Sequence, residues 1–269
     1  MATVLITGAS QGSGKATAIL FAQKGYDVVL TARQPERLEQ SAEAVRGLGR
    51  RALAIPTDVG EAAAVQELVK QALTEFSVID VLINNAGICL TGPMVETTVD
   101  DWQQIMNTNF WGYVYTIQAL LPHFLQRGQG TIVNVGSFGG KMPLPYMTAY
   151  CASKYAVTGL TDTLRLELAP QGIQVCAVHP GVINSNFMER ALFRGKDDQD
   201  SAARRQQLES TLQGAWVSQP EDIAKAIWDA VEKRRSEVVV GAAAVATEAY
   251  RLLPGTVQWM LGQTTKSVD

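Results

Sequence analysis

The chain alternates short runs that are apolar at every position with longer segments in which apolar residues recur every three or four positions. Continuous runs such as Val28-Val29-Leu30 are typical of parallel strands buried on both faces, and the longer spacing is typical of amphipathic helices. A strict alternation of strands and helices predicts a doubly wound parallel sheet with helices on both faces. We expect strands at residues 3–7, 27–32, 52–56, 78–83, 130–135, 173–179 and 237–240.

The expected helices fill the intervals between these strands. They cover residues 15–24, 35–48, 61–75, 98–109 with a continuation to 125, 149–168, 208–213 and 220–233. We expect the polar residues 194–205 to be weakly ordered, inside a variable substrate lid of about residues 186–215. The apolar segment of about residues 250–262 has three open interpretations: it covers the active site, packs on another subunit or lies on a membrane surface.

The composition indicates a single globular domain over residues 1–269, because 46% of the chain is hydrophobic and only 18% is charged. The net charge of -3 gives no electrostatic reason to expect a nucleic-acid partner. No apolar stretch is long enough to predict a transmembrane segment. The N-terminus has no basic, signal-like region, so we expect a cytoplasmic protein.

The cysteines and histidines give no sign of a metal site. Cys89, Cys151 and Cys176 are far apart and form no CxxC pair, which is typical of buried thiols in a reducing compartment. His123 and His179 have no cluster of ligand residues beside them, so we interpret both as structural and predict no metal.

A glycine-rich turn, TGASQGSG at residues 7–14, joins the first strand to the first helix. Glycines there permit a tight turn and a close approach of the backbone to a ligand, and the helix N-terminus offers free N–H groups to a pyrophosphate. The spacing is G-x-x-x-G-x-G and not the general G-x-G-x-x-G fingerprint. The turn alone therefore leaves an ordinary strand-to-helix loop open as an alternative.

Tyr150 and Lys154 lie one helical turn apart, so their side chains lie on the same face of the expected helix. A free tyrosine has a pKa of about 10 and is a poor acid or base at neutral pH. We expect the positive charge of Lys154 to lower the pKa of Tyr150 into a useful range. The spacing is common, so its meaning depends on the other motifs.

Five motifs occur in order along the chain: the glycine-rich turn, NNAG at residues 84–87, Ser137, the Tyr150–Lys154 pair and Pro180-Gly181. Together they resemble the classical short-chain dehydrogenase/reductase family over essentially the whole chain. The resemblance implies a single Rossmann-type domain that binds NAD(H) or NADP(H), and a homodimer or homotetramer formed through long helices. The sequence departs from the family pattern at Ser13, where isoleucine is usual, and at Ser185, where threonine is usual.

The resemblance also implies which residues hold the cofactor. The turn holds the pyrophosphate, Asp58 and Val59 flank the adenine, Asn85-Ala86-Gly87 lines the adenosine ribose and residues 180–185 hold the nicotinamide end. A helix N-terminal cap is the alternative role for Asp58, and Asn84 is expected to be structural. The expected set is Gly8, Ser10, Gln11, Gly12, Ser13, Gly14, Arg33, Asp58, Val59, Asn85, Ala86, Gly87, Tyr150, Lys154, Pro180, Gly181, Ile183 and Ser185.

The end of the second strand indicates which nicotinamide cofactor is used. NAD enzymes place a carboxylate there for the ribose 2′-hydroxyl, but this strand ends Thr31-Ala32-Arg33. An arginine can pair with a 2′-phosphate through charge-assisted hydrogen bonds. We therefore predict NADP(H), with a solvated surface arginine as the alternative.

The chemistry of carbonyl reduction fits the remaining motifs, because negative charge builds on the carbonyl oxygen and must be stabilised and protonated. Tyr150 is the expected proton donor in reduction and base in oxidation, and the Ser137 hydroxyl is expected to donate to the substrate oxygen. The resemblance implies that Lys154 also binds the nicotinamide ribose. It also implies that Asn109 positions a water that relays protons through Lys154.

The substrate pocket is expected between these motifs, at Leu144, Tyr146, Met147, Phe187 and Met188. These side chains indicate an apolar ketone or aldehyde, which the enzyme would interconvert with its alcohol. Two alternatives stay open: a 3-oxoacyl-thioester reductase of fatty-acid type, and a catalytically silent NADP-binding regulator.

Overall fold

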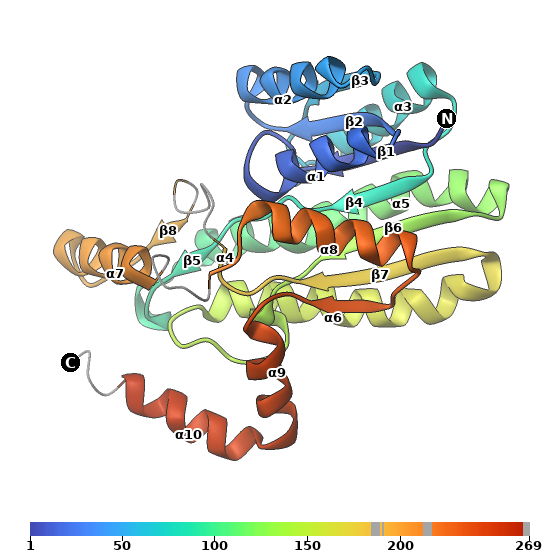
Figure 1. Ribbon diagram of the computed structural model, residues 1–269. Helices are drawn as coiled ribbons and strands as arrows, with labels where there is room; N and C mark the ends of the chain where they lie inside the picture. Colours follow the sequence, from blue (N-terminus) through green and yellow to red (C-terminus); the bar gives the residue numbers. More distant parts are fainter. Residues whose placement is uncertain (184–188, 190, 212–216, 266–269) are drawn as a thin grey trace.

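The computed structural model describes residues 1–183, 189, 191–211 and 217–265. Seven strands form one parallel sheet in the order β3-β2-β1-β4-β6-β7-β9, which confirms the predicted fold class (Figure 1). The strands are β1 (Thr3–Thr7), β2 (Asp27–Ala32), β3 (Ala52–Pro56), β4 (Val81–Asn84), β6 (Gly130–Val135), β7 (Ile173–His179) and β9 (Glu237–Val239).

The strand order reverses between β1 and β4. From β1 the chain moves outward through β2 to β3, and it then returns to place β4 on the other side of β1. Loops that leave the carboxyl ends of β1 and β4 therefore diverge, and such a switch point leaves a crevice in which ligands bind.

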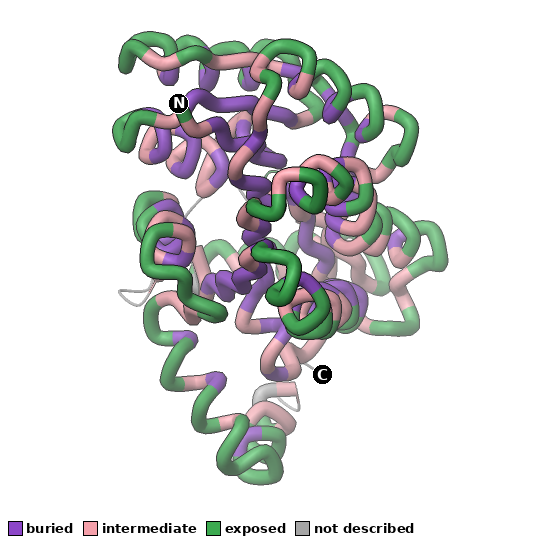
Figure 2. Tube along the Cα trace, turned by 90° about the vertical axis from the view of Figure 1, so that its right-hand side faces the viewer, coloured by how far each residue is buried: buried purple, intermediate pink, exposed green. Residues whose placement is uncertain are grey.

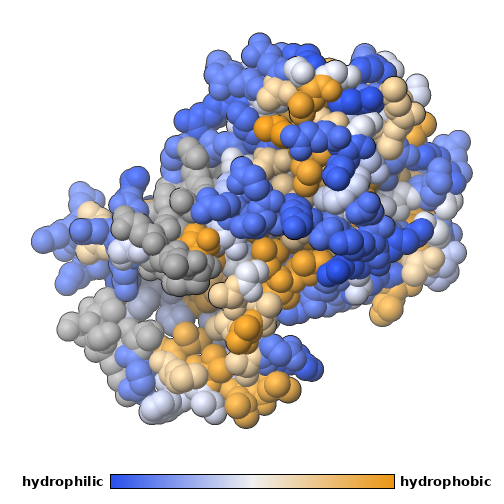
Figure 3. Space-filling view, in the orientation of Figure 1, coloured by the Kyte–Doolittle hydropathy of each residue, from blue (hydrophilic) through white to orange (hydrophobic). Residues whose placement is uncertain are grey.

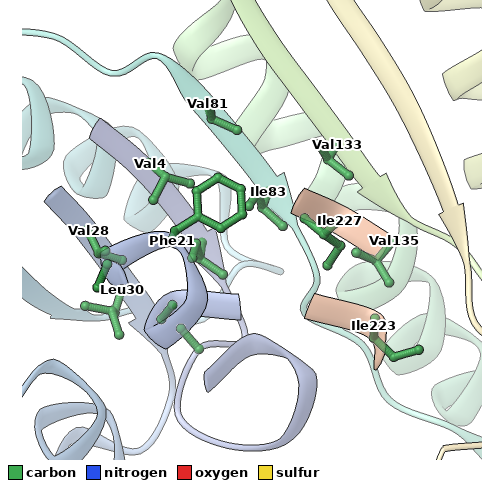
Figure 4. Close-up of a cluster of buried hydrophobic side chains, with 14 of the residues drawn as sticks. Val4, Phe21, Val28, Leu30, Val81, Ile83, Val133, Val135, Ile223 and Ile227 are labelled. Atoms are coloured by element: carbon green, nitrogen blue, oxygen red, sulfur yellow. The ribbon is translucent and has the colours of Figure 1, made fainter. Parts of the chain in front are cut away.

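Helices cover both faces of this sheet (Figure 1). The helices are α1 (Gly12–Gln23), α2 (Pro35–Gly47) and α8 (Pro220–Glu232) on one face, and α3 (Ala62–Phe76), α5 (Gly112–Arg127) and α6 (Thr148–Leu168) on the other. Figure 4 shows the first core layer, in which Phe21 of α1 and Ile223 and Ile227 of α8 lie among strand side chains. Buried residues follow the strands through the centre of the molecule (Figure 2).

Five strands have the predicted bounds, but β4 begins at Val81 and not at residue 78. The N–H of Ile79 lies 3.2 Å from Nε2 of His123, so this residue bonds a side chain and not a neighbouring strand. The predicted helix over residues 98–125 is confirmed with a bend. It consists of α4 (Val99–Met106), a π-helical turn (Asn107–Trp111) and α5. The π turn contains the fully buried Asn109.

The prediction of a weakly ordered segment at residues 194–205 is wrong, because helix α7 (Asp198–Thr211) covers most of it. The predicted helix at residues 208–213 falls on the end of α7 and on residues outside the described part of the chain. Ion pairs one turn apart, Asp200–Arg204 and Arg205–Glu209, stabilise α7, which has no apolar stripe to signal it.

The segment before α7 is joined to the body of the protein. Strand β8 (Leu192–Phe193) pairs with β5 (Leu90–Thr91), two strands too short to predict from an apolar pattern. The guanidinium of Arg194 then donates to both carboxylate oxygens of Asp101, at 2.9 and 2.6 Å.

Helices α9 (Ala243–Leu252) and α10 (Pro254–Thr265) form a C-terminal arm that extends away from the sheet (Figure 1). Leu253 and Trp259 of this arm are largely exposed. Figure 3 shows hydrophobic residues gathered on the surface of the arm. The end of α10 lies near the expected substrate pocket, because the Tyr146 hydroxyl donates to the carbonyl of Thr265 at 3.4 Å. No helix in the described part of the chain is long and apolar enough to cross a membrane.

Candidate active site

A cavity of about 240 Å³ opens at the carboxyl ends of the strands, at the switch point between β1 and β4. Eight residues predicted to bind the cofactor line it: Gly8, Ser10, Gln11, Arg33, Asp58, Val59, Ala86 and Gly87. They lie in the turns that follow the four strands β1, β2, β3 and β4. The fold therefore brings together the adenosine end of the predicted site.

The glycine-rich turn has no room for side chains at two of its positions. Gly8 has a left-handed φ of +67°, which favours glycine. A Cβ on Gly14 would lie 2.2 Å from the carbonyl oxygen of Gly8, a distance that no packed atoms adopt. The first turn of α1 therefore sits directly on the β1 turn. The first N–H groups of a helix have no acceptor within the helix, and they suit an anion. This cradle fits the phosphates of a dinucleotide.

Asn85 supports the turn with its side chain. Its amide donates to the carbonyl of Thr7 at 3.0 Å, and its Oδ1 accepts from the Ser13 hydroxyl at 2.8 Å. The predicted ribose contact of Asn85 therefore does not involve a side chain directed into the cavity. Ser13, a departure from the family pattern, has a clear partner. Asn84 is buried as expected, and it donates to Asn134 of the neighbouring strand β6 at 3.0 Å.

Two arginines line the adenosine end of the cavity, although the sequence pattern identified only one. Nη1 of Arg33 lies 4.0 Å from Asp58, and both side chains are about half exposed. Asp58 also accepts from the N–H of Gly60 at 2.9 Å, in the turn before α3. The N-terminal cap of that helix is Glu61, so the alternative role of Asp58 as a helix cap is wrong. Arg37, in the first turn of α2, contacts Gln11 and forms a 2.8 Å ion pair with Glu189. The sequence signal that could have revealed Arg37 is its position four residues after Arg33.

Tyr150 and Lys154 lie side by side in α6 as predicted, but their electrostatics differ from the expectation. Burial raises the pKa of the Tyr150 phenol, and a hydrogen bond with the Ser137 side chain partly opposes that rise. Burial lowers the pKa of Lys154 to about 8. The predicted lowering of the Tyr150 pKa by Lys154 is therefore wrong here, since desolvation of the phenol is the largest cause and Lys154 is not among the groups that lower its pKa.

Nζ of Lys154 donates to the carbonyl of Val135 at 3.0 Å. The same nitrogen lies beside Gly87, where an added Cβ would be 3.6 Å away. Lys154 thus extends from the tyrosine helix to a residue that lines the cofactor cavity.

Ser137 begins a short 3-10 helix (Phe138–Gly140) directly after β6. Its hydroxyl accepts from the N–H of Gly139 at 3.1 Å and contacts the Tyr150 phenol. The two hydroxyls predicted to bind the substrate oxygen are therefore neighbours, although they come from different elements.

The side chain of Asn109 is fully used within the protein. Its amide donates to the carbonyl of Ile88 at 2.9 Å and to the Ser153 hydroxyl at 3.0 Å, while its Oδ1 accepts from the N–H of Ile88 at 2.9 Å. Asn109 thereby holds the chain after Gly87 against α6. Its predicted water-positioning role stays a prediction.

The expected nicotinamide end lies next to Ser137. The N–H of Phe138 donates to the carbonyl of Pro180 at 2.9 Å, and Gly181 lines a second cavity of about 110 Å³ with Phe138 and Ala243. Ile183 forms a backbone bridge with Ser218. Ser185, Phe187 and Met188 lie outside the described residues.

The loop before α6 carries the other predicted pocket residues. A Cβ on Gly139 would lie 3.0 Å from Leu144 and 3.4 Å from the Tyr150 ring, so Leu144 is close to the phenol. Tyr146 has an unusual left-handed φ of +62°, and the Arg204 guanidinium of α7 lies 4.8 Å from its ring centre. Met147 caps the start of α6.

The chain is similar to known proteins. The family model described as short chain dehydrogenase matches residues 2–195. The ketoacyl reductase HetN of Nostoc sp. is 34% identical over 93% of this chain and 82% of its own length. The NADP-dependent 3-hydroxy acid dehydrogenase YdfG of Escherichia coli is 32% identical over 84% of this chain and 87% of its own.

Solved structures share the fold. A short-chain dehydrogenase from Sphingobium yanoikuyae in complex with NADPH is 31% identical, with a TM-score of 0.77 over 97% of this chain and 95% of its own. A short-chain dehydrogenase/reductase from Burkholderia phymatum in complex with NAD is 26% identical, with a TM-score of 0.83 over 96% and 92%.

Proposed function

Because the chain belongs to the classical short-chain dehydrogenase/reductase family, we propose that it is an NADP(H)-dependent oxidoreductase that interconverts a ketone or aldehyde with its alcohol. The observation that carries this proposal is the contact between the hydroxyls of Ser137 and Tyr150, beside the crevice at the carboxyl end of the sheet. The nicotinamide cofactor supplies the hydride in reduction and accepts it in oxidation.

In this proposal the two hydroxyls bind the oxygen of the substrate. The raised pKa of Tyr150 keeps its phenol protonated at neutral pH, which suits a proton donor for carbonyl reduction. Ser137 donates a second hydrogen bond to the oxygen on which negative charge develops. Oxidation requires the phenolate, so the cationic form of Lys154 must favour it once the two groups face a bound substrate.

Lys154 also holds the cofactor on the side of Gly87. We assign Asn109 a supporting role, because its side chain fixes the backbone of Ile88. Both hydrogens of the Asn109 side-chain amide are already donated, to Ile88 and Ser153, so we do not assign them to a proton relay.

The preference for NADP(H) is supported by the charge at the adenosine end of the cavity. Arg33 and Arg37 offer two guanidinium groups there, and a guanidinium pairs well with a phosphate. The relative YdfG is named as NADP-dependent and the Sphingobium structure contains NADPH, whereas the Burkholderia structure contains NAD. The preference for NADP(H) over NAD(H) is therefore based on the charge of Arg33 and Arg37 in this chain.

The substrate is proposed to be an apolar ketone or aldehyde, since Leu144 lies beside the phenol and the lid segment contains Phe187 and Met188. A 3-oxoacyl-thioester reductase is the second candidate, because the relative HetN is named a ketoacyl reductase. The two candidates differ in the preferred substrate: the first predicts turnover of apolar ketones or aldehydes, and the second predicts a higher kcat/KM for 3-oxoacyl thioesters.

The proposal also includes an oligomeric state and a cellular location for the protein. Helix α6 carries exposed apolar residues, with Tyr155 at 42% and Leu166 at 77% exposure, and this surface suits the helix-to-helix contact of a homodimer or homotetramer. We place the protein in the cytoplasm, with small-molecule substrates and no nucleic-acid partner.

The experiment that tests this function follows NADPH oxidation by the purified protein over ketones, aldehydes, quinones and 3-oxoacyl thioesters. Turnover of apolar ketones or aldehydes supports the leading proposal, and a higher kcat/KM for the thioesters supports the second candidate. Tight NADPH binding without turnover on any of these compounds would support a silent regulator instead.

A further inference from the structure

A buried histidine lies directly behind Ser137. His179 is the last residue of β7, and its side chain is only 1% exposed. Its Nδ1 lies 3.2 Å from the carbonyl oxygen of Ser137. A carbonyl oxygen can only accept a hydrogen bond, so Nδ1 is the donor in this contact.

The other edge of the same ring meets a carboxylate. Nε2 of His179 lies 3.0 Å from Oε1 of Glu237, the first residue of β9. Among the described residues Nε2 has no partner that meets the geometry of a hydrogen bond, so this contact is a close approach of the ring to the carboxylate. Contact with His179, and then with Lys141, lowers the pKa of Glu237 to about 2. The carboxylate is therefore charged at any working pH.

Lys141 is the second residue near the serine that contacts Glu237. It directly follows the 3-10 helix that begins at Ser137, and its ammonium forms an ion pair with Glu237 at 2.5 Å. Glu237 thus binds the chain on both sides of Ser137: through His179 at the serine itself, and through Lys141 four residues later.

Three successive residues of the serine segment bond to three successive residues of β7 and its turn. The N–H of Gly136 donates to the carbonyl of Val178 at 2.8 Å, and the N–H of Phe138 donates to Pro180 at 2.9 Å. The His179 ring makes the contact between them, at Ser137. A Cβ on Gly136 would lie 2.6 Å from Nδ1, so glycine leaves room for the ring against the backbone.

We propose that His179, held by Glu237 and Lys141, is a positioning residue that fixes the Ser137 backbone so that the serine hydroxyl meets the phenol of Tyr150. This inference rests on the proposed role of Ser137 in the reaction. A hydroxyl that must lie within hydrogen-bond distance of both a phenol and a substrate oxygen tolerates little displacement, because a shift of about 1 Å can cost about 100-fold in rate. His179 acts only through Ser137 and touches no reacting atom.

Two substitutions of His179 separate its two contacts. His179→Leu removes both, whereas His179→Asn keeps an amide donor near the position of Nδ1 and loses the contact with Glu237. We expect His179→Leu to lower kcat by about tenfold with the KM for NADPH nearly unchanged, and His179→Asn to recover most of that loss. The matched control is His123→Leu, which removes a histidine that also contacts the backbone, at Ile79, far from Ser137 in the fold. It should leave kcat unchanged.

A double-mutant cycle with Ser137→Ala distinguishes positioning from general damage. If His179 acts through the serine, His179→Leu lowers kcat by less than about twofold in the Ser137→Ala background. An equal loss with and without the serine hydroxyl would overturn the inference while leaving the proposed function intact. If Ser137→Ala alone left kcat unchanged, the proposed role of Ser137 itself would be wrong.

A milder variant keeps the test valid if His179→Leu does not fold. Glu237→Gln removes one charge from a residue that is 36% exposed and keeps the length of the side chain, so it disturbs the core packing less than His179→Leu. The same cycle with this variant should show a smaller loss of kcat, about threefold, that again disappears in the Ser137→Ala background. A loss that persists there would contradict the positioning role.

Discussion

Nζ of Lys154 lies 3.0 Å from the carbonyl oxygen of Val135, and this hydrogen bond joins the tyrosine helix α6 to the end of strand β6. The side chain is only 4% exposed, and burial lowers its pKa to about 8 from an ordinary 10.5. A buried cation of this kind destabilises the fold unless its partners compensate for desolvation. We therefore attribute the position of Lys154 next to Tyr150 and Gly87 to the proposed reaction and not to stability.

Lys154→Met should abolish activity and yet raise the stability of the protein near neutral pH. At about pH 7 the lysine is charged in both the folded and the unfolded protein, so folding must desolvate the charge. Replacing it by an apolar side chain of similar length removes that cost and loses one hydrogen bond, for a net gain on the order of 1 kcal/mol. Calorimetric unfolding of both proteins measures the difference.

The same lysine makes this difference depend on pH. Between pH values of about 8 and 10.5 the unfolded chain binds more protons at Lys154 than the folded protein, so the stability of the wild type rises with pH across this window. The advantage of Lys154→Met should therefore shrink as the pH rises through 8. A variant that is less stable than the wild type at every pH, by a constant amount, would contradict the burial argument.

Arg33→Ala should weaken the use of NADPH and spare that of NADH. Loss of one charge-assisted contact to the 2′-phosphate costs about 1.5–3 kcal/mol, which corresponds to a fall in kcat/KM for NADPH of about 10- to 100-fold. Arg37→Ala should act in the same direction. The matched control is Arg46→Ala, because Arg46 belongs to the same helix as Arg37 but pairs with Glu39 and with the backbone of Ala52. A wild type that prefers NADH would contradict the assignment.

Gly14→Ala should prevent cofactor binding and destabilise the fold. The new Cβ would lie 2.2 Å from the Gly8 carbonyl and 2.7 Å from the Asn85 amide, so backbone atoms would have to move at a cost of about 1–3 kcal/mol or more. Gly47→Ala in α2 is the matched control. No atom lies within 4 Å of that added Cβ, and it should be neutral or stabilising by less than about 1 kcal/mol. Fluorescence titration with NADPH and thermal unfolding measure both effects.

The parts of the fold that depend on apolar runs could be predicted from the sequence. Strands such as β2 and β7 have the expected bounds because each is buried on both faces and ends where polar or glycine residues begin. Helix α7 was missed because its stability comes from charge pairs such as Asp200–Arg204, which leave no apolar period to detect. The short strands β5 and β8 exist only because the fold brings residues 90–91 and 192–193 together.

In the site, too, some features could be predicted from the local sequence, and others depend on how the fold places residues that are distant in the sequence. The spacing of Tyr150 and Lys154 places them on one face of α6, but the direction of the Tyr150 pKa shift depends on burial, which the local sequence does not reveal. Arg37 and His179 carry no motif. Arg37 is placed by its contact with Gln11, and His179 by its contact with Ser137; both partners are distant in the sequence.

The central claim is that Tyr150 exchanges a proton with a carbonyl substrate, and the most direct test compares Tyr150→Phe with the wild type on the best substrate from the NADPH-oxidation screen. The substitution removes only the hydroxyl from a buried ring, so NADPH binding and thermal unfolding should stay close to those of the wild type. The account predicts that kcat falls by about 10²- to 10⁴-fold, the range expected for loss of a general acid. A Tyr150→Phe variant that binds NADPH and turns over within about threefold of the wild type would contradict it.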